Sequence, residues 1–376
     1  MMSFALRARS LAVLSSVLIA TTVAQPAFAG SCTWSQLKTP NPGDGVNELN
    51  SVLAFYVGNV WAVGDSSSAS TGTYEDVIDH WGGSSWTTQI VGMAPLTQLL
   101  SVGGNDNKNV WTAGFATTSN DPSTAAPIAL HFDGTSWTST SPVLMSGWQP
   151  ARFNAITGIG GKDAWAVGFR NTMYGPQQLI EHWKGTKWVD FNIPVQQNTQ
   201  SDLIAIAALS GTNIFALGDW SSNGQSGTMI EHYDGSNWTT SFESTACLST
   251  MTALAPSYIF AAGACGGSST IEFFNGTSWS AQQGPAVDPS TIISGISARS
   301  LTGVFAVGQI PATGQGFSMF FDGNAWTQII VPNPNKDVRI LTATAQVPRL
   351  TEFWTVGTVI PQFGMTRTLS VKPNCT

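Results

Sequence analysis

Short apolar segments follow one another along the chain from about residue 31, separated by turns rich in Gly, Asn and Asp. None of them has the periodicity of an amphipathic helix, so strands are predicted throughout. A motif of an aromatic residue, a small residue, an aliphatic residue and Gly recurs seven times, at intervals of 45 to 54 residues. The copies are Trp61–Gly64, Trp111–Gly114, Trp165–Gly168, Phe215–Gly218, Phe260–Gly263, Phe305–Gly308 and Trp354–Gly357. The chain is therefore predicted to consist of seven structural repeats.

Two further motifs divide each repeat into four strands. Gly, two residues and Trp follow six of the seven copies, and Asp or Asn precedes this Gly in four of them, which is typical of a hairpin turn. A segment with Ser, Ala or Thr at its third position precedes every copy, starting at Leu49, Leu99, Phe153, Leu203, Leu248, Ile292 and Ile340. Such small residues suit the strand nearest a crowded axis. The pattern predicts an all-β fold, a single seven-bladed β-propeller of four-stranded blades.

The seventh repeat lacks the Gly-x-x-Trp strand and ends in a third strand, Thr366 to Lys372. A strand-like segment without a blade, Ser31 to Ser35, lies at the start of the predicted propeller. We therefore expect the N-terminal strand to complete the last blade and close the ring. This closure would bring Cys32 towards Cys375.

The chain has four cysteines, and an even number in an exported chain predicts disulfides. A Cys32–Cys375 bridge would lock the ring closure. Cys247 and Cys265 lie nine residues on either side of Pro256, the centre of a predicted turn. They are predicted to form a structural bridge across the first two strands of the fifth blade.

Residues 1–29 have the anatomy of a secretory signal peptide, with Arg7 and Arg9 before an apolar run and a small-residue cleavage site at its end. A membrane anchor is the alternative, but the run is shorter than the roughly 18 residues that span a bilayer. We expect the propeller, residues 30–376, to be secreted or extracytoplasmic (extracellular or periplasmic), with no integral membrane span. It carries 13 basic and 22 acidic residues, a net charge of −9 that argues against nucleic acid as a partner.

The motif Trp165–Gly168 and the segment His131–Trp137, of sequence HFDGTSW, resemble those of secreted microbial β-propeller repeat proteins of the kelch, Asp-box and photosystem II assembly-factor-like kind. The resemblance covers residues 31–372 and implies the propeller fold, but no particular function. Asp133-Gly134 and Asp234-Gly235 depart from the Asp-box pattern, which has one more residue between Asp and Gly. Sialidases share that propeller, but their arginine cluster, nucleophilic Tyr and acid cannot be mapped onto this chain.

The four histidines share one repeat position, at which two other repeats have Phe273 and Phe320; the histidines are His80, His131, His182 and His232. This predicts a flat, buried ring rather than a metal ligand. The strand neighbours of this position face the opposite way and pair an acid with an aromatic residue. The pairs are Asp79 and Trp81, Glu181 and Trp183, Glu231 and Tyr233, and Glu272 and Phe274. A ring that stacks on a pyranose beside a carboxylate that accepts hydroxyl hydrogen bonds would bind sugar; the alternative is packing between blades.

One residue before each first strand is predicted to ring one end of the central channel: Glu48, Gln98, Arg152, Asp202, Cys247, Thr291 and Arg339. Among these, Glu48, Arg152, Asp202 and Arg339 could hold a small anion or form a catalytic site, and they could equally be paired surface charges. The chain has no Gly-x-Ser-x-Gly elbow, no His-Glu-x-x-His and no Gly-rich phosphate loop. No metal site and no cofactor is predicted.

Export, 15 Trp residues, low charge and the repeated acid–aromatic pair together favour a non-enzymatic binding protein. Its predicted partner is carbohydrate or a cell-surface glycoconjugate, bound as by a lectin. One alternative is a secreted hydrolase or lyase with its site at the central channel. The other is an interaction scaffold or adhesin that contacts another extracellular protein through the loops Ala116–Pro127 and Ser141–Pro150.

Overall fold

The computed structural model describes residues 32–89, 96–118, 124–140, 150–191, 193 and 197–375. The predicted signal peptide lies outside them, as do residues 119–123 and 141–149 of the two loops proposed above as protein contacts. Ser31–Thr376 form one compact unit. In the part of the chain that the structure describes, no helix is long and apolar enough to cross a membrane.

The strands form seven antiparallel sheets of four, numbered here as blades 1 to 7. Blade 1 contains β2 (Asn47–Tyr56), β3 (Asn59–Ser67), β4 (Tyr74–Trp81) and β5 (Trp86–Gln89). Blade 2 contains β6 (Thr97–Asp106), β7 (Asn109–Ala116), β8 (Ala126–Phe132) and β9 (Trp137–Thr140). Blade 3 contains β10 (Ala151–Gly160), β11 (Asp163–Thr172), β12 (Gly175–Trp183) and β13 (Trp188–Asp190). Blade 4 contains β14 (Thr199–Ser210), β15 (Asn213–Ser222), β16 (Gln225–Tyr233) and β17 (Trp238–Ser244).

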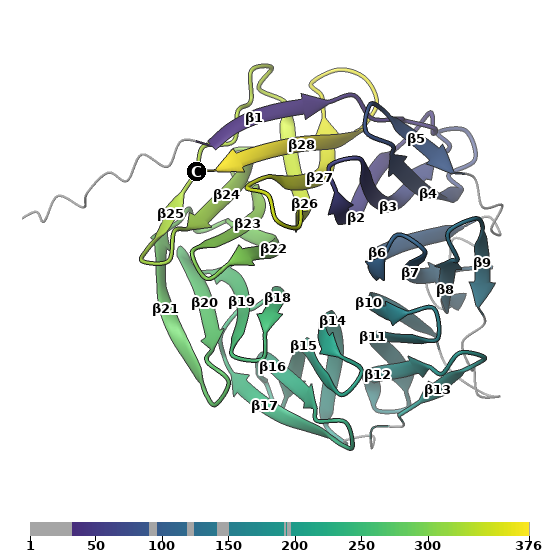
Figure 1. The fold of residues 1–376 in the computed structure, drawn as a ribbon, viewed down its shortest axis with the longest axis vertical. Coiled ribbons are helices and arrows are strands. Elements are labelled where there is room, and N and C mark those ends of the chain that lie inside the picture. Colours follow the sequence, from purple (N-terminus) through teal and green to yellow (C-terminus); the bar gives the residue numbers. More distant parts are fainter. Residues whose placement is uncertain are drawn as a thin grey trace, which may run out of the picture. The chain divides into compact units, whose positions relative to one another are not determined.

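Blade 5 contains β18 (Thr250–Ala255), β19 (Tyr258–Cys265), β20 (Ser268–Phe274) and β21 (Trp279–Ala286). Blade 6 contains β22 (Ile292–Ser300), β23 (Gly303–Ile310), β24 (Gln315–Phe321) and β25 (Trp326–Gln328). Blade 7 contains β26 (Val338–Gln346), β27 (Phe353–Ile360), β28 (Arg367–Cys375) and the N-terminal β1 (Cys32–Leu37). Figure 1 shows the blades as a ring, with the first strand of each blade nearest the centre. The predicted seven-bladed propeller is confirmed.

The ring closes as the sequence predicts. β1 pairs antiparallel with β28, and Cys32 stands directly opposite Cys375 in this register. The two cysteines form a disulfide that spans 343 residues of sequence. The second predicted disulfide, Cys247–Cys265, is also present, and it joins the segment before β18 to the last residue of β19. Disulfides persist in oxidising compartments, so these two bridges indicate an extracytoplasmic environment.

The described residues form seven hydrophobic clusters, and each cluster draws its main side chains from two neighbouring blades. The aromatic residue of each repeated motif lies in such a cluster and is almost completely buried. Trp354 of blade 7, for example, packs against Trp81 and Trp86 of blade 1, with ring centroids 5.2 and 5.4 Å apart. The core of this protein is therefore the set of interfaces between blades.

A β-bulge in the first strand explains the Gly of the repeated motif. The register of the first two strands shifts at the same point in six of the seven blades, as between Leu49 and Ser51 in blade 1. The shift presses a backbone carbonyl towards the second strand. A Cβ on Gly64 would lie 2.0 Å from the carbonyl oxygen of Glu48, and the other six motif glycines have an equivalent contact at 1.7 to 2.3 Å. Only Gly fits at this position because the two backbones approach so closely.

The same bulge turns one side chain towards the next blade. The amide of Asn50 donates to the carbonyl oxygen of Leu99 at 2.9 Å, and the amide of Asn154 donates to that of Leu203 at 2.8 Å. Thr342 donates in the same way to the carbonyl of Leu49 across the closure between blades 7 and 1. These hydrogen bonds join the innermost strands at three of the seven contacts between neighbouring blades.

Removing the long-range disulfide should destabilise the fold more than removing the short one. In the chain-entropy treatment, the long loop contributes roughly 6 kcal/mol and the short loop about 3 kcal/mol. We expect Cys32→Ser with Cys375→Ser to lower the free energy of unfolding, measured in urea, by more than Cys247→Ser with Cys265→Ser lowers it. An equal or smaller loss for the long-range pair would contradict a role in ring closure.

Replacement of a motif glycine should be costly even though its φ angle is ordinary. Gly308→Ala would place a methyl group 1.8 Å from the carbonyl oxygen of Ile292, so the two strands must separate. We expect a loss on the order of 3 kcal/mol in the free energy of unfolding. Gly82→Ala is the matched control, because a Cβ there meets nothing within 4 Å, and it should change stability by less than about 0.5 kcal/mol.

Candidate functional site

The acids of the predicted sugar-binding pairs lie inside the interfaces between blades. Asp79 is completely buried, and Glu181, Glu231 and Glu272 are at most 8% exposed. Asp79 accepts a hydrogen bond from the hydroxyl of Thr88 at 2.6 Å, and Glu231 accepts one from Thr240 at 3.0 Å. Burial raises the pKa of Asp79 to about 6.

The aromatic partners of these acids pack against the motif aromatic of the preceding blade. The ring centroids of Trp81 and Trp354 are 5.2 Å apart, and those of Trp183 and Trp111 are 5.7 Å apart. Tyr233 lies 4.9 Å from Trp165, and its hydroxyl donates to the carbonyl of Gly235. These contacts favour the packing alternative, and a role of the pairs in sugar binding stays a prediction.

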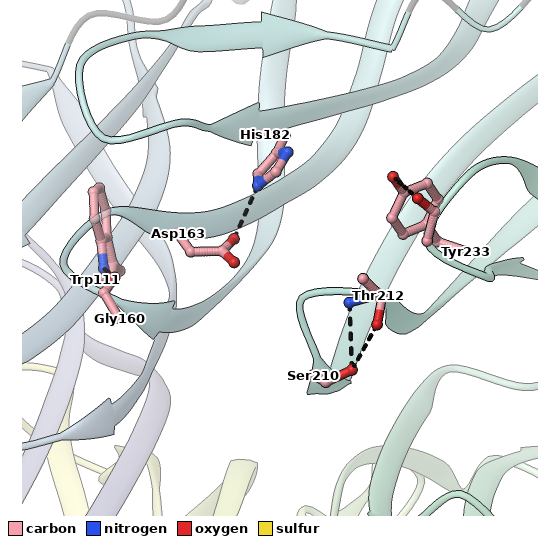
Figure 2. A network of polar contacts seen from close by, with 8 residues as sticks. Trp111, Gly160, Asp163, His182, Ser210, Thr212 and Tyr233 are labelled. Carbon is pink, nitrogen blue, oxygen red and sulfur yellow. Dashed lines mark hydrogen bonds and ion pairs between the residues drawn. The ribbon is translucent and has the colours of Figure 1, made fainter.

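The four histidines stack on the motif aromatic of their own blade. The rings of His182 and Trp165 are 3.9 Å apart and nearly parallel. Nε2 of His182 lies 2.9 Å from a carboxylate oxygen of Asp163, a contact drawn in Figure 2. Burial lowers the pKa of His182, and the hydrogen bond to Asp163 opposes this effect. The structure has the expected flat ring at this position, but the four histidines are half-buried rather than buried.

The predicted ring of residues before the first strands needs a correction in blades 6 and 7. In each blade one carbonyl oxygen in or just before the first strand faces the motif glycine. In blades 6 and 7 it belongs to Ile292 and Ile340, which are therefore the equivalents of Glu48 and lie one residue later than Thr291 and Arg339. Arg339 is buried, and its guanidinium donates to Asn333 and Gln36. Both segments have two adjacent aliphatic residues, so the apolar pattern alone fits either register.

In two blades the candidate channel residue is an acid that stands opposite a second acid on the neighbouring strand. Glu48 pairs with Asp65 across the first two strands of blade 1, and Asp202 pairs with Asp219 in blade 4. Burial and the charge of Glu48 raise the pKa of Asp65 to about 6.

The structure brings together two of the four candidate channel residues, Arg152 and Asp202. Arg152 Nη2 lies 3.8 Å from a carboxylate oxygen of Asp202, and the amide of Asn154 donates to the other oxygen at 2.6 Å. Burial raises the pKa of Asp202 to about 6, against the opposing effect of Arg152, and Asp219 raises it further. The Arg152 guanidinium also lies over the ring of Phe169, 4.9 Å from its centroid. An acid of this pKa beside a second carboxylate could exchange protons or bind a polar ligand near neutral pH.

Two adjoining cavities form a groove over blade 4, which we call the blade 4 groove. One cavity, of about 560 Å³, contains Asp202, Asp219 and Trp220 and extends to Phe169 of blade 3 and Ile292 of blade 6. The other, of about 660 Å³, lies around the β11–β12 and β15–β16 turns. The two cavities share Gln200, Ser221 and Ser226.

The wall of the groove is mostly uncharged and rich in hydrogen-bonding side chains. Met173 is 86% exposed and Tyr174 38% exposed at its outer end, where they offer apolar contact area. Asp202 and Asp219 are the only charged residues in the described wall of the two cavities. Among the described residues, no group of three or more His, Cys, Asp or Glu side chains could hold a metal ion.

Sequence reasoning missed Trp220, Tyr174 and the amide and hydroxyl groups of the groove. A signal did exist, because Asp219 and Trp220 directly follow the motif glycine of blade 4. Equivalent positions in other blades include Thr358 and Val359 in blade 7 and Gln309 and Ile310 in blade 6. The acid recurs as Asp65 in blade 1, whereas the Trp departs from the repeat.

No protein-family model and no curated protein matches the chain. Its fold is similar to that of YCF48 bound to a D1 peptide, with a TM-score of 0.55, 16% identity, and coverage of 90% of this chain and 96% of that one. YCF48 from Cyanidioschyzon merolae has a TM-score of 0.54, 13% identity, and coverage of 90% and 98%. Trypanosoma rangeli sialidase has a TM-score of 0.52 and 11% identity, and the match covers 90% of this chain and 59% of the sialidase. The expected resemblance to propellers of the photosystem II assembly-factor kind is thereby confirmed for the fold.

The buried carboxyl of Asp79 should make stability depend on pH. Its pKa of about 6 in the folded protein exceeds the ordinary value of 3.8, so folding takes up a proton between these two values. The free energy of unfolding should therefore rise as the pH falls from 7.5 to 4.5, with a contribution from Asp79 of at most about 3 kcal/mol. Asp79→Asn should make this rise smaller in urea unfolding at the two pH values.

Asp133→Asn is the control for this measurement. Asp133 is fully exposed, and backbone hydrogen bonds from Ser136 and Thr135 lower its pKa. Its contribution has the opposite sign, so the substitution should not reduce the rise on acidification. An unchanged pH dependence in Asp79→Asn would contradict the burial argument.

Proposed function

We propose that this chain is exported and acts as a non-enzymatic binding protein that holds an extended polypeptide segment in the blade 4 groove. The observation that carries the proposal is the pair of adjoining cavities, about 560 and 660 Å³ in volume. An extended segment presents backbone N–H and C=O groups along its whole length, and the wall of the groove supplies amide and hydroxyl partners such as Gln200, Ser221 and Ser226. The exposed side chains of Met173 and Tyr174 offer apolar anchors at one end.

The similarity to a propeller solved with a bound peptide supports this class of ligand, since that match covers nearly the whole of both chains. Export is proposed because two disulfides need an oxidising compartment and because residues 1–29 have the pattern of a signal peptide.

Carbohydrate or a cell-surface glycoconjugate is the second candidate ligand. It is favoured by the carboxylates of Asp202 and Asp219 in the same groove as the exposed ring of Tyr174. This combination of acid and aromatic ring is the one expected of a sugar site, and here it borders an open cavity. The arrangement of Arg152 and Asp202 also leaves a hydrolytic role open to test, by analysis of each bound ligand for cleavage products.

The test is a selection from a random peptide library and a parallel glycan panel, both on the oxidised protein. We expect peptides to be enriched, and Ser221→Trp, which fills the groove, to weaken their binding at least tenfold. Ile360→Trp is the matched control because Ile360 has the same repeat position in blade 7 and is also exposed. It should leave binding unchanged.

Enrichment of glycans alone would replace the first candidate by the second. Peptide binding that Ser221→Trp does not alter would move the site away from the groove, and no binding in either selection would overturn the proposed function.

A further inference from the structure

A third cavity, of about 250 Å³, lies between blades 3 and 4 and adjoins the blade 4 groove. Its wall includes Gln178 of β12, Ser201 of β14, Trp220 of β15, Glu231 of β16 and Glu243 of β17. Ser201 and Trp220 also line the groove. The cavity is therefore adjacent to the place of a ligand in the groove.

The cavity contains two acids and no base among its described residues. Glu231 is only 7% exposed. Burial raises the pKa of Glu231, the hydroxyl of Thr240 opposes this effect, and the charge of Glu243 adds to it. A negative charge on the buried Glu231 is costly unless a proton or a cation compensates it.

Blade 3 has a buried cation at the equivalent place. Arg170 in blade 3 has the repeat position of Trp220, two residues after the motif glycine, and Glu181 has the position of Glu231. The Arg170 guanidinium is buried and forms an ion pair with the buried carboxylate of Asp190. Blade 4 keeps the glutamate, adds Glu243 at the wall and has Trp220 in place of the arginine.

Further polar groups in this cavity point to a ligand. The amide oxygen of Gln178 is buried and has no hydrogen-bond partner, and the indole N–H of Trp220 is also buried without one. A guanidinium group has five N–H donors, which the two glutamates and the Gln178 oxygen could accept, and its flat face can stack on an indole. The Trp220 N–H could donate to a backbone carbonyl of the same ligand.

We propose that this cavity is a specificity pocket that receives the side chain of an arginine from the polypeptide bound in the groove. The inference rests on the proposed function for its source of arginine, but the pocket can be tested without an intact peptide ligand. Arginine is preferred over lysine because its planar fork engages two carboxylates at once.

The probes are the Nα-acetyl, N-methylamide derivatives of arginine, lysine and citrulline, titrated by calorimetry into the oxidised protein. Citrulline keeps the shape of arginine but has no charge. We expect arginine to bind more tightly than lysine, and citrulline at least tenfold more weakly than arginine. Glu231→Gln with Glu243→Gln should weaken the binding of the arginine probe at least tenfold.

Two further variants make the test specific. Glu272→Gln is the matched control, because Glu272 is the buried equivalent of Glu231 in blade 5, and it should leave binding unchanged. Trp220→Arg restores the arginine of blade 3 and should abolish binding by occupying the pocket from within. If a double variant does not fold, Glu243→Gln alone, at an exposed position, should still weaken binding.

Equal affinity for arginine and citrulline, or binding that Glu243→Gln does not change, would overturn the proposal. Peptide binding that depends on Ser221 but not on arginine would overturn this inference and leave the proposed function intact. Binding of the arginine probe without enrichment of any peptide would overturn the proposed function and leave the arginine pocket intact.

Discussion

The structure depends on one constraint, that both faces of every blade must be covered by another blade. Each of the seven hydrophobic clusters joins two neighbours, so no blade has a complete core of its own. Blade 7 and blade 1 can cover each other only if the ring closes. The pairing of β1 with β28 and the Cys32–Cys375 bridge secure this closure by joining the two ends of the chain.

The bulge of the first strand connects this constraint to the candidate site. It brings the carbonyl oxygen of Asp202 against Gly218, and it turns Asn154 towards both the backbone of Leu203 and the carboxylate of Asp202. The Asn154 amide therefore joins blades 3 and 4 and also holds the carboxylate of Asp202 in the wall of the groove. A site built in this way is held by the rigid inner strands rather than by a loop, which suits a binding surface that is formed before its ligand arrives.

The repeats allowed the fold to be predicted almost completely from the sequence. Seven copies of one motif determined the number of blades, and the missing fourth strand of the last repeat indicated the closure and its disulfide. Trp81 lies in the cluster between blades 7 and 1, and Asp79, two residues earlier on the same strand, is completely buried. Alternation cannot tell a covered face from an open one when both faces of a sheet are covered, so it did not reveal that these residues are buried. The register in blades 6 and 7 failed for a related reason, because two adjacent aliphatic residues satisfy the apolar pattern in either position.

The groove could not be predicted from the sequence because it is defined by departures from the repeat rather than by the repeat itself. Positions that all blades share must serve packing, since every blade has the same two neighbours to cover. A position at which one blade has a different residue need not serve this packing in that blade. Trp220 is such a position: the equivalent Arg170 completes a buried ion pair within blade 3, whereas blade 4 leaves two glutamates beside an open cavity. In a protein built of equivalent blades, each blade thus serves as an internal reference for the others, and blade 4 departs from that reference where Trp220 replaces the buried cation of its neighbour.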